Sequence, residues 1–295
     1  MTVSIRQIHP VFVGEVEGAD LRRPLTVEEA AAIDAGMDKY GVLVFHDQDI
    51  TDEQQLAFSA NFGTIEAPGS ATNITKEDER RIRADMADVS NLDREHRPFA
   101  RDDRRRMFNL GNRLWHSDSS FRAVPAKYSL LSGRIIPSRG GNTEFADMRA
   151  AYDALDDATK AEIENLVCEH SLIYSRGLLG FTELTDEEKA NFKPVRQSLV
   201  RVHPVTGRKS LFLSSHIGTI VGWPVPEARA FIRDLIEHAT QREFVYSHSW
   251  RQYDLIIWDN RQTMHRVRRF DDTRDIRDMR RTTIQGEAMT AQQAA

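Results

Sequence analysis

Apolar residues along this chain occur mostly in short runs, and these runs predict several short strands. Residues 42–45 are all apolar, which is typical of a short buried strand. Residues 199–203 and 210–213 flank a turn that contains Pro204 and Gly207, and this pattern predicts a β-hairpin. Three further strands are predicted at residues 244–250, 255–258 and 279–284.

Helix signals occur at three places in the chain. Thr26 precedes a helical segment and Glu29 follows three residues later, which is the spacing of a capping box, and Gly41 marks the expected end. Thr51 begins a second segment in the same way. The clearest amphipathic helix is predicted at residues 225–239, where apolar residues recur at i, i+3, i+4, i+7 and i+8.

The periodic pattern fails between residues 67 and 106. This stretch is rich in mixed charge, and only residues 86–92 suggest a strand. A loop of this length is often functional, such as a lid over an active site. Short strands, few helices and one long insertion predict a mostly β fold with flanking helices, a jelly roll. Because no repeat or linker divides the chain, we predict one domain over residues 1–295 with a lid insertion at 67–111.

Composition and charge exclude some classes of partner. The chain has 295 residues, of which 40% are hydrophobic and 29% are charged, and this is typical of a globular protein. A net charge of −5 gives no reason to expect nucleic acid, and no run of 18 apolar residues suggests a membrane span. Cys168, the single cysteine, fits a reducing compartment and a buried structural thiol. We therefore expect a cytoplasmic protein.

Residues 115–118 (Trp-His-Ser-Asp) contain the first candidate metal ligands. On a strand, positions i and i+2 point to the same face, so His116 and Asp118 could bind one ion. With 10 histidines and 45 acidic residues in the chain, about one or two His-x-acid patterns would arise by chance. In isolation, this motif is therefore better explained as a polar pair on the surface.

A second candidate ligand follows residues 258–261 (Trp-Asp-Asn-Arg), where a predicted strand leads through a polar turn to His265. Two histidines and one carboxylate form the ligand set of non-haem iron(II) oxygenases, which leaves one face of the ion open. Zinc is the competing metal, but closed zinc sites use four ligands rich in cysteine and histidine. The distant Cys168 therefore disfavours zinc. The predicted iron ligands are His116, Asp118 and His265.

Arg277 and Arg281 lie four residues apart in the last predicted strand. On a strand they share a face, about 13 Å apart. Two guanidiniums on an inward face are costly unless each meets a carboxylate. The two arginines are therefore either surface residues on an exposed strand, or each of them binds a carboxylate through two hydrogen bonds.

Together these segments resemble the taurine/2,4-dichlorophenoxyacetate dioxygenase family of 2-oxoglutarate-dependent non-haem iron oxygenases. The resemblance covers nearly the whole chain, and its residues 115–121, 147–155 and 237–246 are most similar to the 2,4-dichlorophenoxyacetate branch. The poorest similarity lies at residues 67–111, and the spacing from His265 to Arg277 is one residue longer than usual. The matching positions are His116, Asp118, residues 140–143 (Gly-Gly-Asn-Thr), residues 147–152 (Asp-Met-Arg-Ala-Ala-Tyr), residues 258–261, His265, Arg277 and Arg281.

The resemblance implies a double-stranded β-helix that binds Fe(II) through its three predicted ligands and uses 2-oxoglutarate and O2. It implies that Thr143 and Arg277 bind the distal carboxylate of 2-oxoglutarate. Arg281 matches the arginine that faces the anionic group of the substrate, and Asn112 matches a residue of the substrate pocket. His170 and His216 lie in segments that border the pocket in relatives, with a purely structural role as the alternative.

The resemblance also implies a substrate class. An aryloxyacetate would be hydroxylated at the carbon next to its carboxylate, giving a phenol, glyoxylate, succinate and CO2. The alternatives are the same chemistry on a sulfonate such as taurine or on an alkyl sulfate, and a non-catalytic barrel that binds a metal or an acid. Candidates for the apolar wall of the pocket are Phe108, Leu110 and Trp223, and the equal alternative for each is a place in the core. We expect a homo-oligomer that binds a small aromatic acid and neither nucleic acid nor a membrane.

Overall fold

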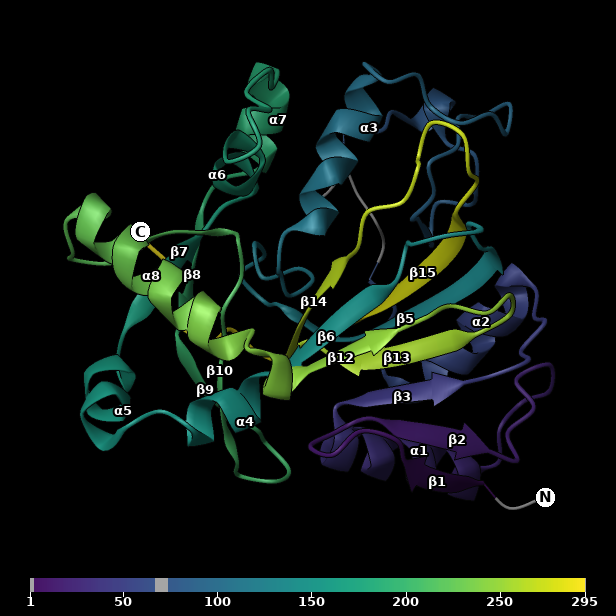
Figure 1. The fold of residues 1–295 in the computed structure, drawn as a ribbon, viewed down its shortest axis with the longest axis horizontal. Coiled ribbons are helices and arrows are strands. Elements are labelled where there is room, and N and C mark those ends of the chain that lie inside the picture. The colour runs from purple at the N-terminus through teal and green to yellow at the C-terminus, as the bar shows by residue number, and fades with distance from the viewer. Residues whose placement is uncertain (1–2, 67–73, 295) are drawn as a thin grey trace.

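A computed structural model describes residues 3–66 and 74–294 of the chain. Its largest sheet has seven strands, with β13 and β5 near the centre and both ends formed by short strands (Figure 1). The strand order is β1 (Ser4–Gln7), β2 (Gly14–Glu17), β3 (Val42–Phe45), β13 (Leu255–Asp259), β5 (Ala126–Ile135), β15 (Asp278–Gln285) and β4 (Ala87–Asp88).

A three-stranded sheet forms a second layer against the large one (Figure 1). It consists of β12 (Val245–His248), β6 (Thr143–Asp147) and β14 (Thr263–Val267). Two smaller sheets extend the fold on one side. They contain β11 (Ile217–Ile220), β7 (Val167–His170) and β8 (Val195–Ser198), and the predicted hairpin of β9 (Val200–Val202) and β10 (Lys209–Leu211).

Helices cover the outside of this arrangement, and the predicted caps are confirmed. The Thr26 side chain accepts from the Glu29 amide and the Glu29 side chain accepts from the Thr26 amide, while Gly41 has the positive φ of 72° that ends the helix. The helices are α1 (Val27–Tyr40), α2 (Asp52–Ser59), α3 (Arg104–Asn109), α4 (Met148–Asp153), α5 (Asp157–Ile163), α6 (Leu172–Gly177), α7 (Asp186–Asn191) and α8 (Val225–Ala239), with 3-10 turns at Ala60–Phe62, Glu77–Glu79, Leu110–Arg113 and Arg242–Phe244.

Strands β3 and β13 are buried on both faces, which explains their apolar runs. On the outer face, Leu43 and Ile257 pack against Ile33 of α1. On the inner face, Trp258 packs against Phe145 of β6, with ring centroids 5.5 Å apart. Each fully buried aliphatic or aromatic side chain stabilises the fold by about 1.5–3 kcal/mol relative to an exposed one. The two layers therefore form a rigid frame on which loops can hold a site.

The strand predicted at residues 86–92 is too long, because only Ala87–Asp88 pairs with β15. Of the predicted lid at 67–111, residues 67–73 lie outside the described residues. The remainder contains the 3-10 turn Glu77–Glu79, β4, α3 and the first half of the 3-10 turn Leu110–Arg113, and it lies at the open end of the sheets (Figure 1). A single domain with a lid stays a prediction. Within residues 3–66 and 74–294, no helix is both long and apolar enough to cross a membrane.

Candidate active site

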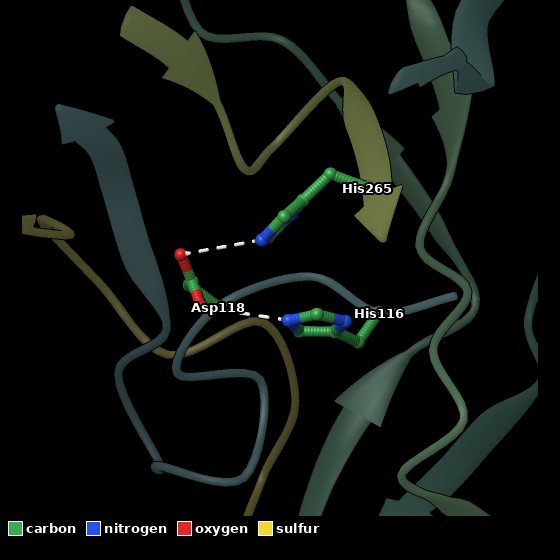
Figure 2. A group of neighbouring side chains, drawn as sticks. All are labelled: His116, Asp118 and His265. Carbon is green, nitrogen blue, oxygen red and sulfur yellow. Dashed lines mark ion pairs between the residues drawn. The ribbon is translucent and has the colours of Figure 1, made fainter. Parts of the chain in front are cut away.

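The side chains of the three predicted metal ligands lie together and point toward one another (Figure 2). His265 belongs to β14, and its backbone faces that of His116, with N–H to carbonyl distances of 3.0 Å and 2.8 Å. Residues paired in this way point their side chains to the same face. The expectation that residues 116–118 form a strand is wrong: His116 makes an isolated bridge and Asp118 lies in the turn that follows. The side chains of His116 and His265 therefore converge because the backbone of His116 pairs with that of β14.

The ligand atoms are close enough to share one ion. Nε2 of His116 lies 3.9 Å from Oδ1 of Asp118, and Nε2 of His265 lies 3.7 Å from Oδ2 (Figure 2). One donor atom from each of the three buried side chains lies within 4.8 Å of the others. Two imidazoles and one carboxylate on one face match the donor set that non-haem iron(II) enzymes use.

Hydrogen bonding and burial prepare both histidines to bind a metal. Nδ1 of His116 donates to the Leu114 carbonyl over 2.8 Å, so its Nε2 carries the free lone pair. Burial lowers the pKa of His116 and lowers the pKa of His265 well below its usual value. The His265 ring is held against Trp258, with centroids 4.6 Å apart. Both imidazoles are therefore neutral at pH 7, the form that coordinates a cation.

Asp118 is held by a network that sequence reasoning did not find. Its Oδ2 accepts from the Ser129 hydroxyl over 2.7 Å, and its Oδ1 accepts from Nη1 of Arg281 over 2.6 Å. Burial alone would raise the pKa of Asp118, but Arg281 and the two histidines outweigh it and lower the pKa to about 2. The Asp118 amide donates to Oδ1 of Asn260 over 3.0 Å. The motif at 258–261 was recognised, but its partner lies 142 residues earlier.

A first cavity opens beside the ligands and contains both residues predicted to bind 2-oxoglutarate. Thr143 and Arg277 line it together with His116 and His265. The Thr143 hydroxyl accepts from the Trp250 indole over 2.9 Å, so its own hydrogen is free to point elsewhere.

Arg277 lies one residue before β15, whose pairing with β5 is irregular between Asp278 and Met279. The Arg277 side chain is buried, and among the described residues no side chain or carbonyl accepts from its guanidinium. Burial lowers the pKa of Arg277 to about 10, so it stays charged at pH 7.

A second cavity adjoins the first, and His116, Asn112 and Arg281 line both. His216 lines only the second cavity, where its ring meets that of Phe121 edge-on at 5.0 Å. Its Nδ1 donates to the Ser175 hydroxyl over 2.8 Å, and burial lowers its pKa well below the usual value. The remaining lining includes the side chains of Phe108, Leu172, Glu66, Arg122 and Arg176.

Of the other residues predicted to lie at or near the pocket, only some line a cavity. Phe108 lines the second cavity and Leu110 lines the first. Trp223 lines neither cavity and packs against Phe231 of α8, with centroids 5.3 Å apart, so its place in the pocket wall is wrong and the core alternative is confirmed. His170 is stacked on Phe212 at 5.5 Å and lines neither cavity, while Cys168 is buried with its pKa raised to about 12 by burial.

A family model described as "Taurine catabolism dioxygenase TauD, TfdA family" matches residues 4–283. The chain belongs to this family. Among curated members, it is 43% identical to the alpha-ketoglutarate-dependent 2,4-dichlorophenoxyacetate dioxygenase of Cupriavidus pinatubonensis, over 98% of this chain and 100% of that protein. It is 38% identical to the (S)-phenoxypropionate/alpha-ketoglutarate-dioxygenase of Sphingobium herbicidovorans, over 80% of this chain and 79% of the other.

A solved structure extends the comparison within the TauD, TfdA family. The structure of AAD-2 in complex with Mn(II) and N-oxalylglycine superposes with a TM-score of 0.96, at 63% identity over 99% of this chain and 100% of that one. The family resemblance and the predicted jelly roll with flanking helices are thereby confirmed. The enzyme class is that of dioxygenases.

Proposed function

We propose that this protein is an Fe(II)- and 2-oxoglutarate-dependent dioxygenase that hydroxylates an aryloxyacetate at the carbon next to its carboxylate. The observation that carries the proposal is the unpaired, buried Arg277 in a cavity that also contains His116 and His265. A co-substrate with one carboxylate near the metal and another at its far end fits this arrangement. The names of the relatives at 43% and 38% identity support the same reaction.

His116, Asp118 and His265 hold the metal in this proposal. Bound iron supplies the activation of O2 that is coupled to the oxidative decarboxylation of 2-oxoglutarate. The chain's own residues keep the ligands in place: Ser129 and Arg281 orient the carboxylate, and the Leu114 carbonyl fixes the His116 tautomer. Burial of all three ligands keeps bulk water away from the reacting atoms.

Thr143 and Arg277 bind the distal carboxylate of 2-oxoglutarate. The Thr143 hydroxyl accepts from the Trp250 indole, and its own hydrogen remains available to donate, for which a carboxylate oxygen is a matching acceptor. The Arg277 guanidinium lacks a counter-ion within the described part of the chain, and a carboxylate would neutralise it with two parallel hydrogen bonds.

The organic substrate occupies the second cavity. Phe108, Phe121 and Leu172 offer an apolar wall for an aromatic ring, and Asn112, Arg281 and His216 face the substrate. One oxygen atom of O2 enters the substrate and the other enters succinate. The hydroxylated aryloxyacetate is a hemiacetal, and it collapses to a phenol and glyoxylate. A cytoplasmic homo-oligomer remains the expectation from sequence.

A substrate panel tests this function. The iron-loaded protein is supplied with 2-oxoglutarate, O2 and one of phenoxyacetate, either enantiomer of 2-phenoxypropionate, taurine or an alkyl sulfate. Burial of an aromatic ring is worth roughly 25 cal/mol per Å² of apolar area, so phenoxyacetate should exceed taurine by more than about tenfold in kcat/KM. Equal or faster sulfite release from taurine would reassign the substrate to sulfonates. Absence of succinate with every compound would indicate a binding protein.

A further inference from the structure

The second cavity contains three arginines, and only one of them lacks an acidic partner. Arg281 is paired with Asp118, and Arg122 is paired with Glu66 over 2.6 Å. Among the described residues, none accepts a hydrogen bond from Arg176. Asp88, the third carboxylate that lines this cavity, is paired with Arg81 over 2.8 Å, so the positive charge of Arg176 remains uncompensated.

Arg176 is buried as deeply as the metal ligands. It belongs to α6, and 6% of its surface is exposed. Burial lowers the pKa of Arg176 to about 10, so it is still charged at pH 7. Its guanidinium lies over the Phe108 ring, 4.4 Å from the centroid. A cation–π contact of this kind is worth about 2 kcal/mol when desolvated, which offsets only part of the cost of burying a charge.

The backbone opposite α6 is shaped to accommodate this guanidinium. A Cβ atom added at Gly111 would lie 2.1 Å from Nη1 of Arg176. Gly111 has no positive φ, so its backbone conformation does not require glycine. The missing side chain therefore serves to leave room for Arg176, which lies between Phe108 and Gly111 at the edge of the cavity.

We propose that Arg176 is a substrate-binding residue, whose guanidinium receives the carboxylate of the aryloxyacetate in the second cavity. The proposal rests on the function proposed above and adds to it. Arg281 shares its charge with Asp118 and is only partly available to the substrate. Arg176 has its whole charge available, and a monoanion bound there would neutralise it. Burial of the acid there pairs both charges, which an uncharged substrate cannot do.

Binding can be measured without turnover, on protein loaded with Mn(II) and N-oxalylglycine and titrated calorimetrically. Arg176→Met keeps the contact with Phe108 and removes the charge. We expect its affinity for phenoxyacetate to fall by at least about 30-fold. Its affinity for the neutral 2-phenoxyacetamide and for N-oxalylglycine should stay within about twofold of wild type. Its Tm should be unchanged or higher, because an uncompensated buried charge is gone.

Three further variants sharpen the test. Arg176→Lys should recover part of the affinity for phenoxyacetate, and Gly111→Ala should weaken it by displacing the guanidinium without changing the charge. The matched control is Arg229→Gln, because Arg229 is exposed on α8 and lies over the ring of Tyr174, also in α6, at 4.5 Å. It should bind phenoxyacetate like the wild type.

Unchanged affinity of Arg176→Met for phenoxyacetate would overturn the proposal and leave Arg281 as the cation that binds substrate. Equal loss of the acid and the amide, with a lower Tm, would make Arg176 a structural residue. If the wild type binds taurine or an alkyl sulfate in place of phenoxyacetate, the proposed substrate fails, and the role of Arg176 is judged on that anion. If the wild type binds none of these anions, both proposals fail.

Discussion

Arg281 of β15 and Asp118 in the turn after His116 form a direct ion pair, with Nη1 2.6 Å from Oδ1. The pair connects the last strand of the large sheet to a proposed metal ligand 163 residues earlier in the chain. It orients one carboxylate oxygen, while the hydroxyl of Ser129 binds the other. The proposed metal ligand is therefore held by rigid strands although it lies in a turn.

Replacement of any one ligand should abolish turnover. His116→Ala, Asp118→Ala and His265→Ala each leave two donors, so we expect loss of most Fe(II) binding in a metal-limited buffer. Metal content and succinate release are the measurements. Asp118→Glu should retain a small fraction of activity because it keeps the donor. His238→Gln is the control, since His238 donates to the Ala151 carbonyl on α4. Near-normal activity of an alanine variant would refute the ligand set.

Arg277→Met should raise the requirement for 2-oxoglutarate. Loss of a desolvated charge-assisted pair costs on the order of 2–5 kcal/mol, so the affinity for 2-oxoglutarate should fall by about 30-fold or more. The affinity for Mn(II) alone should stay unchanged. Arg274→Gln, which alters an exposed arginine three residues earlier, is the control. An effect confined to the organic substrate would mean that Arg277 serves the other cavity.

Arg281→Ala should weaken the binding of both Fe(II) and the organic substrate. The variant removes the cation that pairs with Asp118, so Fe(II) should bind more weakly, and it also removes a residue that lines both cavities. Arg176→Met, by contrast, should leave Fe(II) affinity intact. Metal titration of both variants separates these roles. Equal Fe(II) affinity in Arg281→Ala and wild type would show that Ser129 suffices to orient Asp118.

Asn260→Ala should destabilise the protein and loosen the metal site together. The Asn260 side chain accepts from the Asp118 amide and the Trp258 indole and donates to the Ser129 hydroxyl. Unsatisfied buried groups cost about 1–3 kcal/mol, which should appear as a lower free energy of unfolding. Fe(II) affinity should fall as well. Asn191→Ala, on exposed α7, is the control. A stable variant with full Fe(II) affinity would contradict this role.

Asp259 should make the free energy of unfolding fall at acidic pH. Burial alone would raise its pKa, but Arg261, together with a hydrogen bond from Gln262 and the nearby ring of His203, holds the pKa of Asp259 far below the usual value. A depressed folded-state pKa gives stability that is complete above the unfolded pKa of about 3.9 and is lost as the pH falls below it.

Asp259→Asn should therefore cost about 3–5 kcal/mol in the free energy of unfolding at pH 7, because it leaves Arg261 buried and unpaired. The difference from wild type should shrink below about pH 4. Urea unfolding across pH measures both. Asp186→Asn alters a fully exposed carboxylate and should follow the wild type at every pH. A difference that stays constant down to pH 2 would contradict the assignment.

Local signals in the sequence predicted local structure well. The capping box of Thr26 and Glu29 and the apolar periodicity at residues 225–239 each depend on neighbours within a few turns. The longest strand, β5, was missed, because its residues read as an irregular mixture although most are buried on both faces. Residues 116–118 were assigned to a strand because the i, i+2 spacing suggested one, whereas the register with β14 places His116 opposite His265.

The candidate site also has a part that the sequence predicted and a part that depends on the tertiary fold. Residue types and spacing indicated the three proposed iron ligands that lie together in the structure. The network around Asp118 depends on Ser129, Asn260 and Arg281, which meet only after three strands have paired. Arg176 carried no sequence signal. In the chain it is one arginine among many, and only burial without a counter-ion distinguishes it.

The two cavities differ in the backbone that holds the residues proposed to bind their ligands. In the first, Thr143 and His265 lie on the paired strands β6 and β14. The residues found only in the second come mostly from short helices and turns, such as Phe108 of α3 and Arg176 of α6. Loops tolerate replacement far better than central strands. Divergence toward new acids can therefore proceed on α6, which lines only the second cavity, while the strands that carry Thr143 and His265 stay unchanged.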